Sequence, residues 1–124
     1  QQAGDVLGAY GRSGLIAVYG SAGRNAAFRL QGGDVFVRGS VESHAAFRMS
    51  SGTLIIGGNA GSMLGEHMTG GTIFVRGEVQ SVAPNVEETR LRESDRLRLS
   101  LVLLKAGVKS TATHREFRVF KAIP

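Results

Sequence analysis

The residues best suited to acid–base or metal chemistry in this sequence are its three histidines, His44, His67 and His114. His67 directly follows Glu66, and an imidazole beside a carboxylate can act as a metal-binding pair or as an acid–base pair. Glycines recur in this chain at intervals of 19 residues, which indicates a repeat described below. His44 and His67 are not separated by a multiple of 19, so they occupy different positions of that repeat and we do not expect them to stack as a ligand pair. We therefore interpret His67 as a polar residue at a corner of the fold.

The other motifs that carry chemistry are absent or incomplete. Residues 57–61, Gly-Gly-Asn-Ala-Gly, resemble a phosphate-binding loop in composition alone, because they lack the Lys-Ser/Thr pair and we expect no helix after them. No Gly-x-Ser-x-Gly elbow supports a serine hydrolase. Cysteine is absent, which excludes disulfides, thiolate zinc sites, iron–sulfur clusters and a cysteine nucleophile. We predict that the chain has no catalytic residues and binds no metal, flavin or cluster itself.

Basic residues are concentrated toward the end of the chain. The net charge is +5, and the residues from Pro84 onward contain nine Lys or Arg against five Asp or Glu. A basic tail is a feature of nucleic-acid-binding proteins. Here the acidic residues are interleaved with the basic ones, which favours a solvated helix face. Arg29 and Arg48 share one phase of the 19-residue spacing, and Arg38 and Arg76 share another. We interpret them as surface charges, with binding of an acidic partner as the alternative.

No apolar run in the sequence approaches the length of about 20 residues that a membrane span needs. The run Leu101–Leu104 has four residues, which is also too short for a signal-peptide core. We expect a cytoplasmic protein that does not use a membrane.

Glycine spacing reveals an internal repeat. Two sets of four glycines recur at intervals of 19 residues, and each pair brackets five residues. The two sets are Gly14, Gly33, Gly52 and Gly71, and Gly20, Gly39, Gly58 and Gly77. Glycine at both ends of each short segment allows positive φ, so we predict that these are corner residues of a solenoid with one strand in each coil.

The side chains between the glycines form columns of similar residues when the coils are aligned. Two strand columns lie two residues apart and are aliphatic, which is the pattern of a strand with one apolar face. The aligned columns are Ile16, Val35, Leu54 and Ile73; Val18, Val37, Ile56 and Val75; Ala22, Val41, Ala60 and Val79, with Ala3 one period earlier; and Leu30, Met49 and Met68. Because parallel crossovers are almost always right-handed, the sequence predicts an all-β fold, a right-handed parallel β-helix with 19-residue coils.

The segment after the repeat is expected to cover the outward side of the strands, where the apolar column Ala17, Phe36, Ile55 and Phe74 would otherwise be exposed. Ser94 has the character of a helix N-cap and Gly107 that of a C-terminal stop. The apolar face of the helix between them is predicted to contain Leu97, Leu101, Leu104 and Val108, widened by Leu99, Val102 and Leu103. Glu116–Phe120 alternates as a short strand.

We divide the chain into a β-helix part, residues 1–83, and a C-terminal extension, residues 84–124, which together form one structural domain.

In register, Ala3–Arg12 match Ala22–Gln31, so the strand at Leu15–Tyr19 has no neighbour before it. An open parallel edge has unpaired N–H and C=O groups, and solenoids need covered ends. We therefore expect a homo- or hetero-oligomer.

Several segments of the repeat resemble a known family. Gly65–Gly71 precedes one predicted strand and Ala17–Gly23 ends another, both at the 19-residue glycine spacing. Over about residues 3 to 81 this pattern resembles the C-terminal β-helix (GXGXG) domain of the large subunit of glutamate synthase. Phe117–Pro124 is similar to the end of that subunit. The same repeat occurs in the β-helix subunit of formylmethanofuran dehydrogenase and in the related formyltransferase/hydrolase complex.

The resemblance implies a structural role in nitrogen metabolism. In glutamate synthase this β-helix sits between a glutamine amidotransferase and an FMN-containing synthase and helps to shape the assembly through which ammonia passes. For this chain it implies a non-catalytic scaffold of a related oxidoreductase complex, in which FMN and an iron–sulfur cluster are bound only by the partner subunits. The alternatives are a scaffold of the formylmethanofuran dehydrogenase type and, in another class, a free-standing basic protein that binds nucleic acid.

Overall fold

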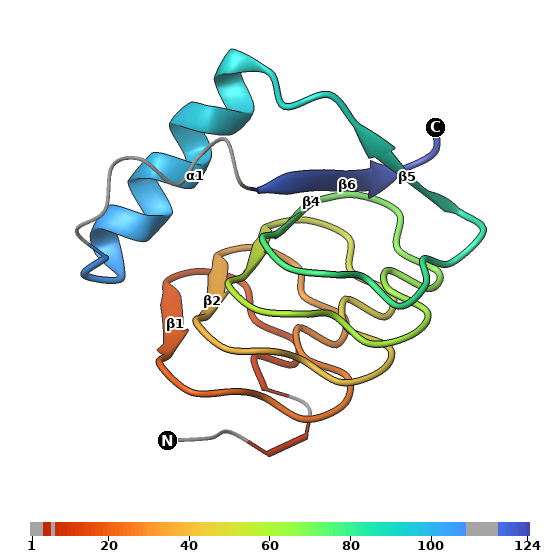
Figure 1. Cartoon of the computed structure of the whole chain (residues 1–124), viewed down its shortest axis with the longest axis horizontal. Coiled ribbons are helices and arrows are strands. Elements are labelled where there is room, and N and C mark those ends of the chain that lie inside the picture. The colour runs from red at the N-terminus through yellow and green to blue at the C-terminus, as the bar shows by residue number, and fades with distance from the viewer. Residues whose placement is uncertain (1–3, 6, 109–116) are drawn as a thin grey trace.

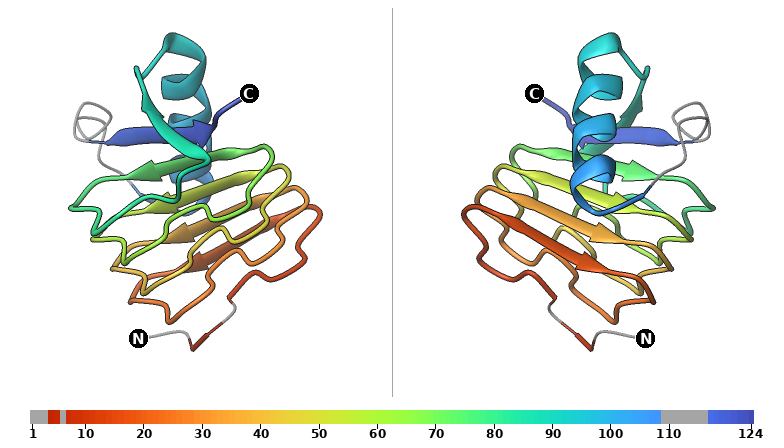
Figure 2. Two further views of the ribbon diagram at one scale, coloured as in Figure 1. Left: turned by 90° about the vertical axis from the view of Figure 1, so that its right-hand side faces the viewer. Right: turned by 90° about the vertical axis from the view of Figure 1, so that its left-hand side faces the viewer.

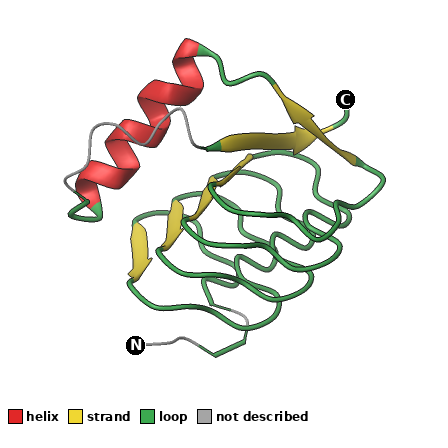
Figure 3. Cartoon of the chain, in the orientation of Figure 1, coloured by secondary structure: helices red, strands yellow, loops and turns green. Residues whose placement is uncertain are grey.

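A computed structural model of the chain describes residues 4–5, 7–108 and 117–124. Its main feature is a stack of coils, each with one short strand on the same side and loops elsewhere (Figures 1 and 3). The elements in chain order are β1 (Leu15–Val18), β2 (Asp34–Val37), β3 (Thr53–Ile56), β4 (Thr72–Val75), β5 (Val86–Thr89), α1 (Glu93–Lys105) and β6 (Arg118–Ala122).

The strands pair in the register that the sequence predicts. β1 to β4 are parallel neighbours, and each residue is opposite the one 19 positions later, as in Val35↔Leu54 and Val37↔Ile56. A second set of bridges joins Ala22, Val41, Ala60 and Val79 from coil to coil. The parallel β-helix with 19-residue coils is therefore confirmed.

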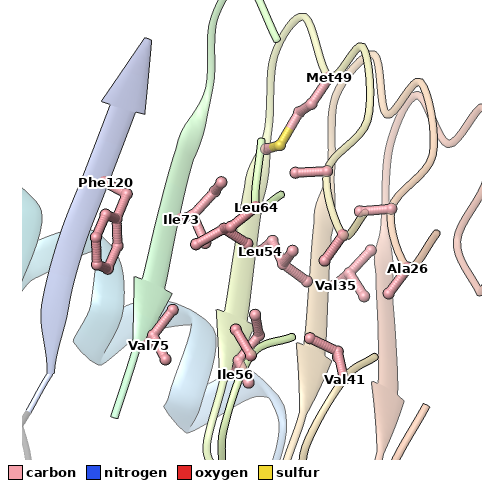
Figure 4. Close-up of a cluster of buried hydrophobic side chains, with 14 of the residues drawn as sticks. Ala26, Val35, Val41, Met49, Leu54, Ile56, Leu64, Ile73, Val75 and Phe120 are labelled. Carbon is pink, nitrogen blue, oxygen red and sulfur yellow. The ribbon is translucent and has the colours of Figure 1, made fainter. Parts of the chain in front are cut away.

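The interior of the coils is filled by the predicted columns (Figure 4). Leu54, Ile56 and Ile73 are fully buried, and Met49 and Met68 fill the space on the loop side. Each buried aliphatic side chain of this size contributes roughly 1.5–3 kcal/mol. The aligned columns therefore provide the main stabilisation of the solenoid.

The two glycine columns have different roles, which corrects the prediction that all eight allow positive φ. Gly14, Gly33, Gly52 and Gly71 have φ between 74° and 96°. Those of the other column do not adopt positive φ. They are needed because the coils approach closely: a Cβ on Gly39 would lie 2.7 Å from the carbonyl oxygen of Gly20, and one on Gly77 would lie 2.6 Å from that of Gly58.

Positive φ also occurs at residues that are not glycine, on the loop side of the coils. Asn25, Ala27 and Arg29 have φ between 53° and 61°, and the residues 19 positions later repeat the pattern. Alternate amides point to opposite neighbours: the Arg29 N–H donates to Phe47 O at 2.7 Å, and the Ala46 N–H donates to Ala26 O at 2.7 Å. Left-handed backbone costs energy in L-residues, and these bonds between coils hold it in place.

The sheet is closed at one end and open at the other. Its strand order is β1-β2-β3-β4-β6-β5, with β6 antiparallel to both β4 and β5. Asn85 completes the last coil, because its side-chain Nδ2 donates to Gly65 O and Met68 O at 3.1 Å each and its side-chain Oδ1 accepts from the backbone N–H of His67 at 3.3 Å. β5 was not predicted, and β6 lies two residues later than the predicted strand, whose first residue, Glu116, is outside the described residues.

Helix α1 covers the outward side of the sheet (Figure 2), as predicted. Phe36, Ile55 and Phe74 are at most 3% exposed and form a second core with the helix. At the end of β1 the Tyr19 hydroxyl donates to the carbonyl of Ala106, which ties the first strand to the C-terminal end of α1. The described parts of the extension, residues 84–108 and 117–124, thus pack directly on the coils.

Two details of the predicted helix were wrong. The N-cap is Arg92, not Ser94, because the Asp95 carboxylate accepts a hydrogen bond from the Arg92 N–H at 2.9 Å and fixes the start of the helix there. The centre of the predicted face was also wrong, since Leu97, Leu101 and Leu104 are 64%, 51% and 72% exposed. The side chains predicted only to widen it, Leu99, Val102 and Leu103, are buried, and the predicted face residue Val108 packs against the same core.

An ion pair joins the start of α1 to β6. Asp95 is 6% exposed and also accepts a hydrogen bond from Lys121 Nζ at 2.9 Å. Burial by itself raises the pKa of Asp95, but the Arg92 N–H and the hydrogen bond and charge of Lys121 outweigh it, so the pKa lies below its ordinary value. A carboxylate with a lowered folded-state pKa stabilises the fold at neutral pH.

We expect Asp95→Asn to lower the free energy of unfolding by about 1–3 kcal/mol near pH 7, because Lys121 loses its counter-charge. This contribution is fully present above the unfolded-state pKa of about 4 and is lost as the pH falls through the lower folded-state value. Urea unfolding near pH 7 and near pH 3 should therefore show a deficit that shrinks on acidification. Glu93→Gln, on the same helical turn but exposed, is the control. An equal deficit of Asp95→Asn at both pH values would contradict this account.

Candidate functional site

A groove of about 480 Å³ crosses the loop side of three successive coils. It is lined by two rows of side chains, and within each row the residues are 19 positions apart. One row is Arg29, Arg48 and His67, and the other is Gln31, Ser50 and Thr69. Each coil therefore supplies one basic side chain and one neutral hydrogen-bonding side chain.

The backbone of the coils fixes these rows. Arg29, Arg48 and His67 all have left-handed φ, between 53° and 61°. The residue that follows each of them (Leu30, Met49 or Met68) is buried in the interior core. Three consecutive side chains thus point into the groove, into the core and into the groove again. The hydrogen bonds between coils repeat this arrangement at every turn.

Aromatic rings hold the two guanidinium groups. Phe28 and Phe47 are stacked with ring centroids 5.5 Å apart and an angle of 2° between their planes. Arg29 Cζ lies 5.7 Å from the Phe28 centroid and Arg48 Cζ lies 5.5 Å from that of Phe47. Such cation–π contacts orient a guanidinium without neutralising its charge.

The groove has an excess of positive charge. Within the described residues, neither Arg29 nor Arg48 forms an ion pair with a carboxylate, and no carboxylate lines the groove. Rungs of a parallel ladder are about 4.8 Å apart. Two guanidinium groups at that spacing repel each other by about 1 kcal/mol even in water-like surroundings. A bound anion would relieve this repulsion.

Glu66 connects the two histidines that the repeat assigns to different columns. Its carboxylate oxygens lie 3.3 Å from His44 Nε2 and 4.0 Å from His67 Nε2. The histidines do not stack on each other, but sequence reasoning missed that one carboxylate reaches both. In the part of the chain that the structure describes, no group of three His, Cys, Asp or Glu residues is arranged to hold a metal ion. His114 lies outside the described residues.

The remaining predicted residues are structural or lie apart from the groove. Arg38 and Arg76 are exposed at the other end of their strands. Residues 57–61 form a corner of a coil, where the Asn59 Oδ1 accepts the Glu78 N–H at 2.9 Å. The row of Gln31, Ser50 and Thr69 was missed, although the 19-residue spacing would have aligned these residues.

Two apolar surfaces lie outside the groove. At the open end of the sheet, Ile16 in β1 is 40% exposed and Tyr19, directly after β1, is 49% exposed. On α1, the exposed side chains of Leu97, Leu101 and Leu104 follow one helical face. Exposed apolar surfaces of this kind are a feature of contact sites between proteins.

In the part of the chain that the structure describes, the fold and these surfaces define a small parallel β-helix with a basic groove and an open sheet edge. No protein-family model matches the sequence, and no curated protein matches it either. Among the described residues, no helix has both the length and the apolar character that crossing a membrane requires.

Proposed function

We propose that this chain is a non-catalytic scaffold module of a cytoplasmic, glutamate-synthase-related complex, with a glutamine amidotransferase and an FMN synthase as partner subunits. The resemblance of the glycine repeat to the GXGXG domain suggests the family of the complex. The open edge of β1 is the observation that carries the scaffold role. The runner-up within the same class is a scaffold of the formylmethanofuran dehydrogenase type.

The open edge supports this proposal because the two ends of the sheet differ. The β4 end is covered by the antiparallel strands β6 and β5, whereas within the described residues β1 pairs with β2 alone. The carbonyls of Gly14 and Val18 accept hydrogen bonds from the N–H groups of Asp34, in β2, and of Arg38, directly after it. In a parallel pair alternate residues face opposite sides, so Leu15 and Ala17 direct their N–H and C=O groups to the free side. A partner strand can add there.

Ile16→Lys should weaken association with a partner at β1 by tenfold or more, because an edge lysine blocks strand addition. The control is Val82→Lys, since Val82 is 37% exposed, close to the 40% of Ile16, but lies in the last coil. Sedimentation would be measured at micromolar concentration, alone and with co-expressed amidotransferase and FMN synthase subunits. A wild-type chain that stays monomeric and binds neither of these proteins would refute the scaffold proposal.

A further inference from the structure

We infer that the basic groove binds the phosphate chain of a ligand with two or more linked phosphoryl groups, either an inorganic oligophosphate or a nucleoside triphosphate. This inference does not depend on the scaffold proposal, because it rests on a different surface. The groove volume of about 480 Å³ is within the usual range for small-molecule sites.

Every side chain that lines the groove can donate a hydrogen bond. Arg29 and Arg48 contribute guanidinium groups, His67 a ring N–H, and Gln31 an amide, and the last two positions are hydroxyls. The Ser50 hydroxyl donates to Leu30 O across 3.4 Å, a long bond that it would exchange for one to the ligand. Guanidinium groups match the geometry of phosphate oxygens and bind them in pairs of hydrogen bonds. No carboxylate lines the groove, and Glu66, 4.0 Å from His67 Nε2, lies outside its lining. The two guanidinium charges therefore disfavour a cation there and favour an oxyanion.

The aromatic rings preorganise the two guanidinium groups. Arg29 and Arg48 each lie over the ring of the preceding phenylalanine, and the two rings are stacked on each other. Two long side chains that are otherwise free to move are thus held on adjacent coils. Preorganisation reduces the entropy lost when a ligand orders such side chains.

Because the groove presents similar side chains on each successive coil, it favours a ligand whose charged groups also repeat. A single phosphate can meet the two guanidiniums but leaves donors of the third coil without a partner, whereas a longer anion can engage all three coils, each of which offers a basic or imidazole donor and a neutral donor. An extended acidic peptide presents side chains on one face about every 6.6 Å, out of step with rungs about 4.8 Å apart. Phosphoryl groups joined by one oxygen lie closer together than the rungs and carry oxygens on every side, so one chain of them can accept hydrogen bonds from adjacent coils without matching the coils one to one.

The inference can be tested by titration calorimetry of the full chain with sodium tripolyphosphate, in EDTA and at fixed ionic strength. We expect saturable binding of one molecule per chain and at least tenfold weaker binding of orthophosphate. ATP is titrated in parallel. Equal affinities for ATP and tripolyphosphate identify the phosphate chain alone as the recognised group, and tighter binding of ATP identifies a nucleotide as the source. Both outcomes support the inference.

Paired variants separate a local site from general positive charge. Arg29→Gln with Arg48→Gln should weaken tripolyphosphate binding at least tenfold, because charged hydrogen bonds are lost. The control, Arg38→Gln with Arg96→Gln, removes the same charge from exposed positions elsewhere and should change the affinity less than twofold. Ser50→Ala with Thr69→Ala should weaken binding severalfold without a change of charge.

Three results would overturn the inference. The first is no saturable binding of tripolyphosphate at millimolar concentration. The second is an equal loss of affinity in the two double arginine variants, which would indicate non-specific attraction. The third is tighter binding of a single-stranded oligonucleotide than of tripolyphosphate, which would assign the groove to nucleic acid.

Discussion

Ile56→Asp is expected to abolish soluble, folded protein. Ile56 is 0% exposed and lies in the ladder between Val37 and Val75. An aspartate there has no cationic or donor side chain in the surrounding column and must be buried as an unpaired charge or take up a proton. Either state costs several kcal/mol. A small domain has only about 5–15 kcal/mol of total stability, so most of the chain should be insoluble on expression.

The control for this variant is Arg38→Asp, which places the same side chain beside the core residue Val37 but on an exposed position. It should remain soluble and keep a thermal unfolding midpoint within a few degrees of the wild type. Ile56→Val, which removes one methylene group, should cost about 0.5–1.5 kcal/mol. The soluble fraction and circular dichroism of the three variants provide the measurement. Equal behaviour of the two aspartate variants would show that the inward and outward columns are wrongly assigned.

The interior of this fold is readable from the sequence because a solenoid repeats by translation. Residues 19 apart occupy the same environment inside the stack, so the burial of Val35 also predicts that of Leu54 and Ile73, whereas Ile16, in the same column at the open end, is 40% exposed. The register, the interior columns and the cover over Phe36 and Phe74 all follow from this rule. Each further coil that places similar residues in the same columns adds support for the predicted repeat. A single strand or helix offers no such repeated support.

Helix α1 lies outside the repeat, so the rule that residues 19 apart share an environment does not apply to it. Both faces of α1 are rich in leucine, so periodicity alone cannot choose between Leu101 and Leu99. The choice is made by tertiary contacts: the ion pair of Asp95 with Lys121 fixes the rotation of the helix relative to β6. Sequence spacing contains no information about that pair, because its partners are 26 residues apart and lie outside the repeat.

Only part of the groove could be predicted from the sequence, for a similar reason. The spacing aligned Arg29, Arg48 and His67, but their outward direction depends on left-handed backbone at residues that are not glycine. Composition gives no signal for positive φ at an arginine. The stacking of Phe28 on Phe47, which holds the guanidiniums, depends on the same backbone.

Leu99→Asp is expected to destabilise the protein by several kcal/mol, because it places a carboxylate in the core between α1 and the sheet. Leu99 is 0% exposed and packs in the cluster of Phe36, Ile55 and Phe74. Loss of a large apolar side chain from a core costs about 2–5 kcal/mol by itself, and the buried charge adds to it. If the helix detaches, the apolar column on the sheet is exposed, so the variant should bind a hydrophobic dye or aggregate.

Leu101→Asp is the matched control, two residues further along the same helix. Leu101 is 51% exposed, so the isolated chain should tolerate aspartate there, with a change in unfolding free energy of about 0.5 kcal/mol or less. Dye fluorescence and denaturant unfolding of the two variants should therefore differ sharply. The opposite order, with Leu101→Asp unfolded and Leu99→Asp stable, would restore the helix face that periodicity predicts and contradict the packing of α1 described above. Equal stability of both variants would mean that α1 does not cover the sheet in solution.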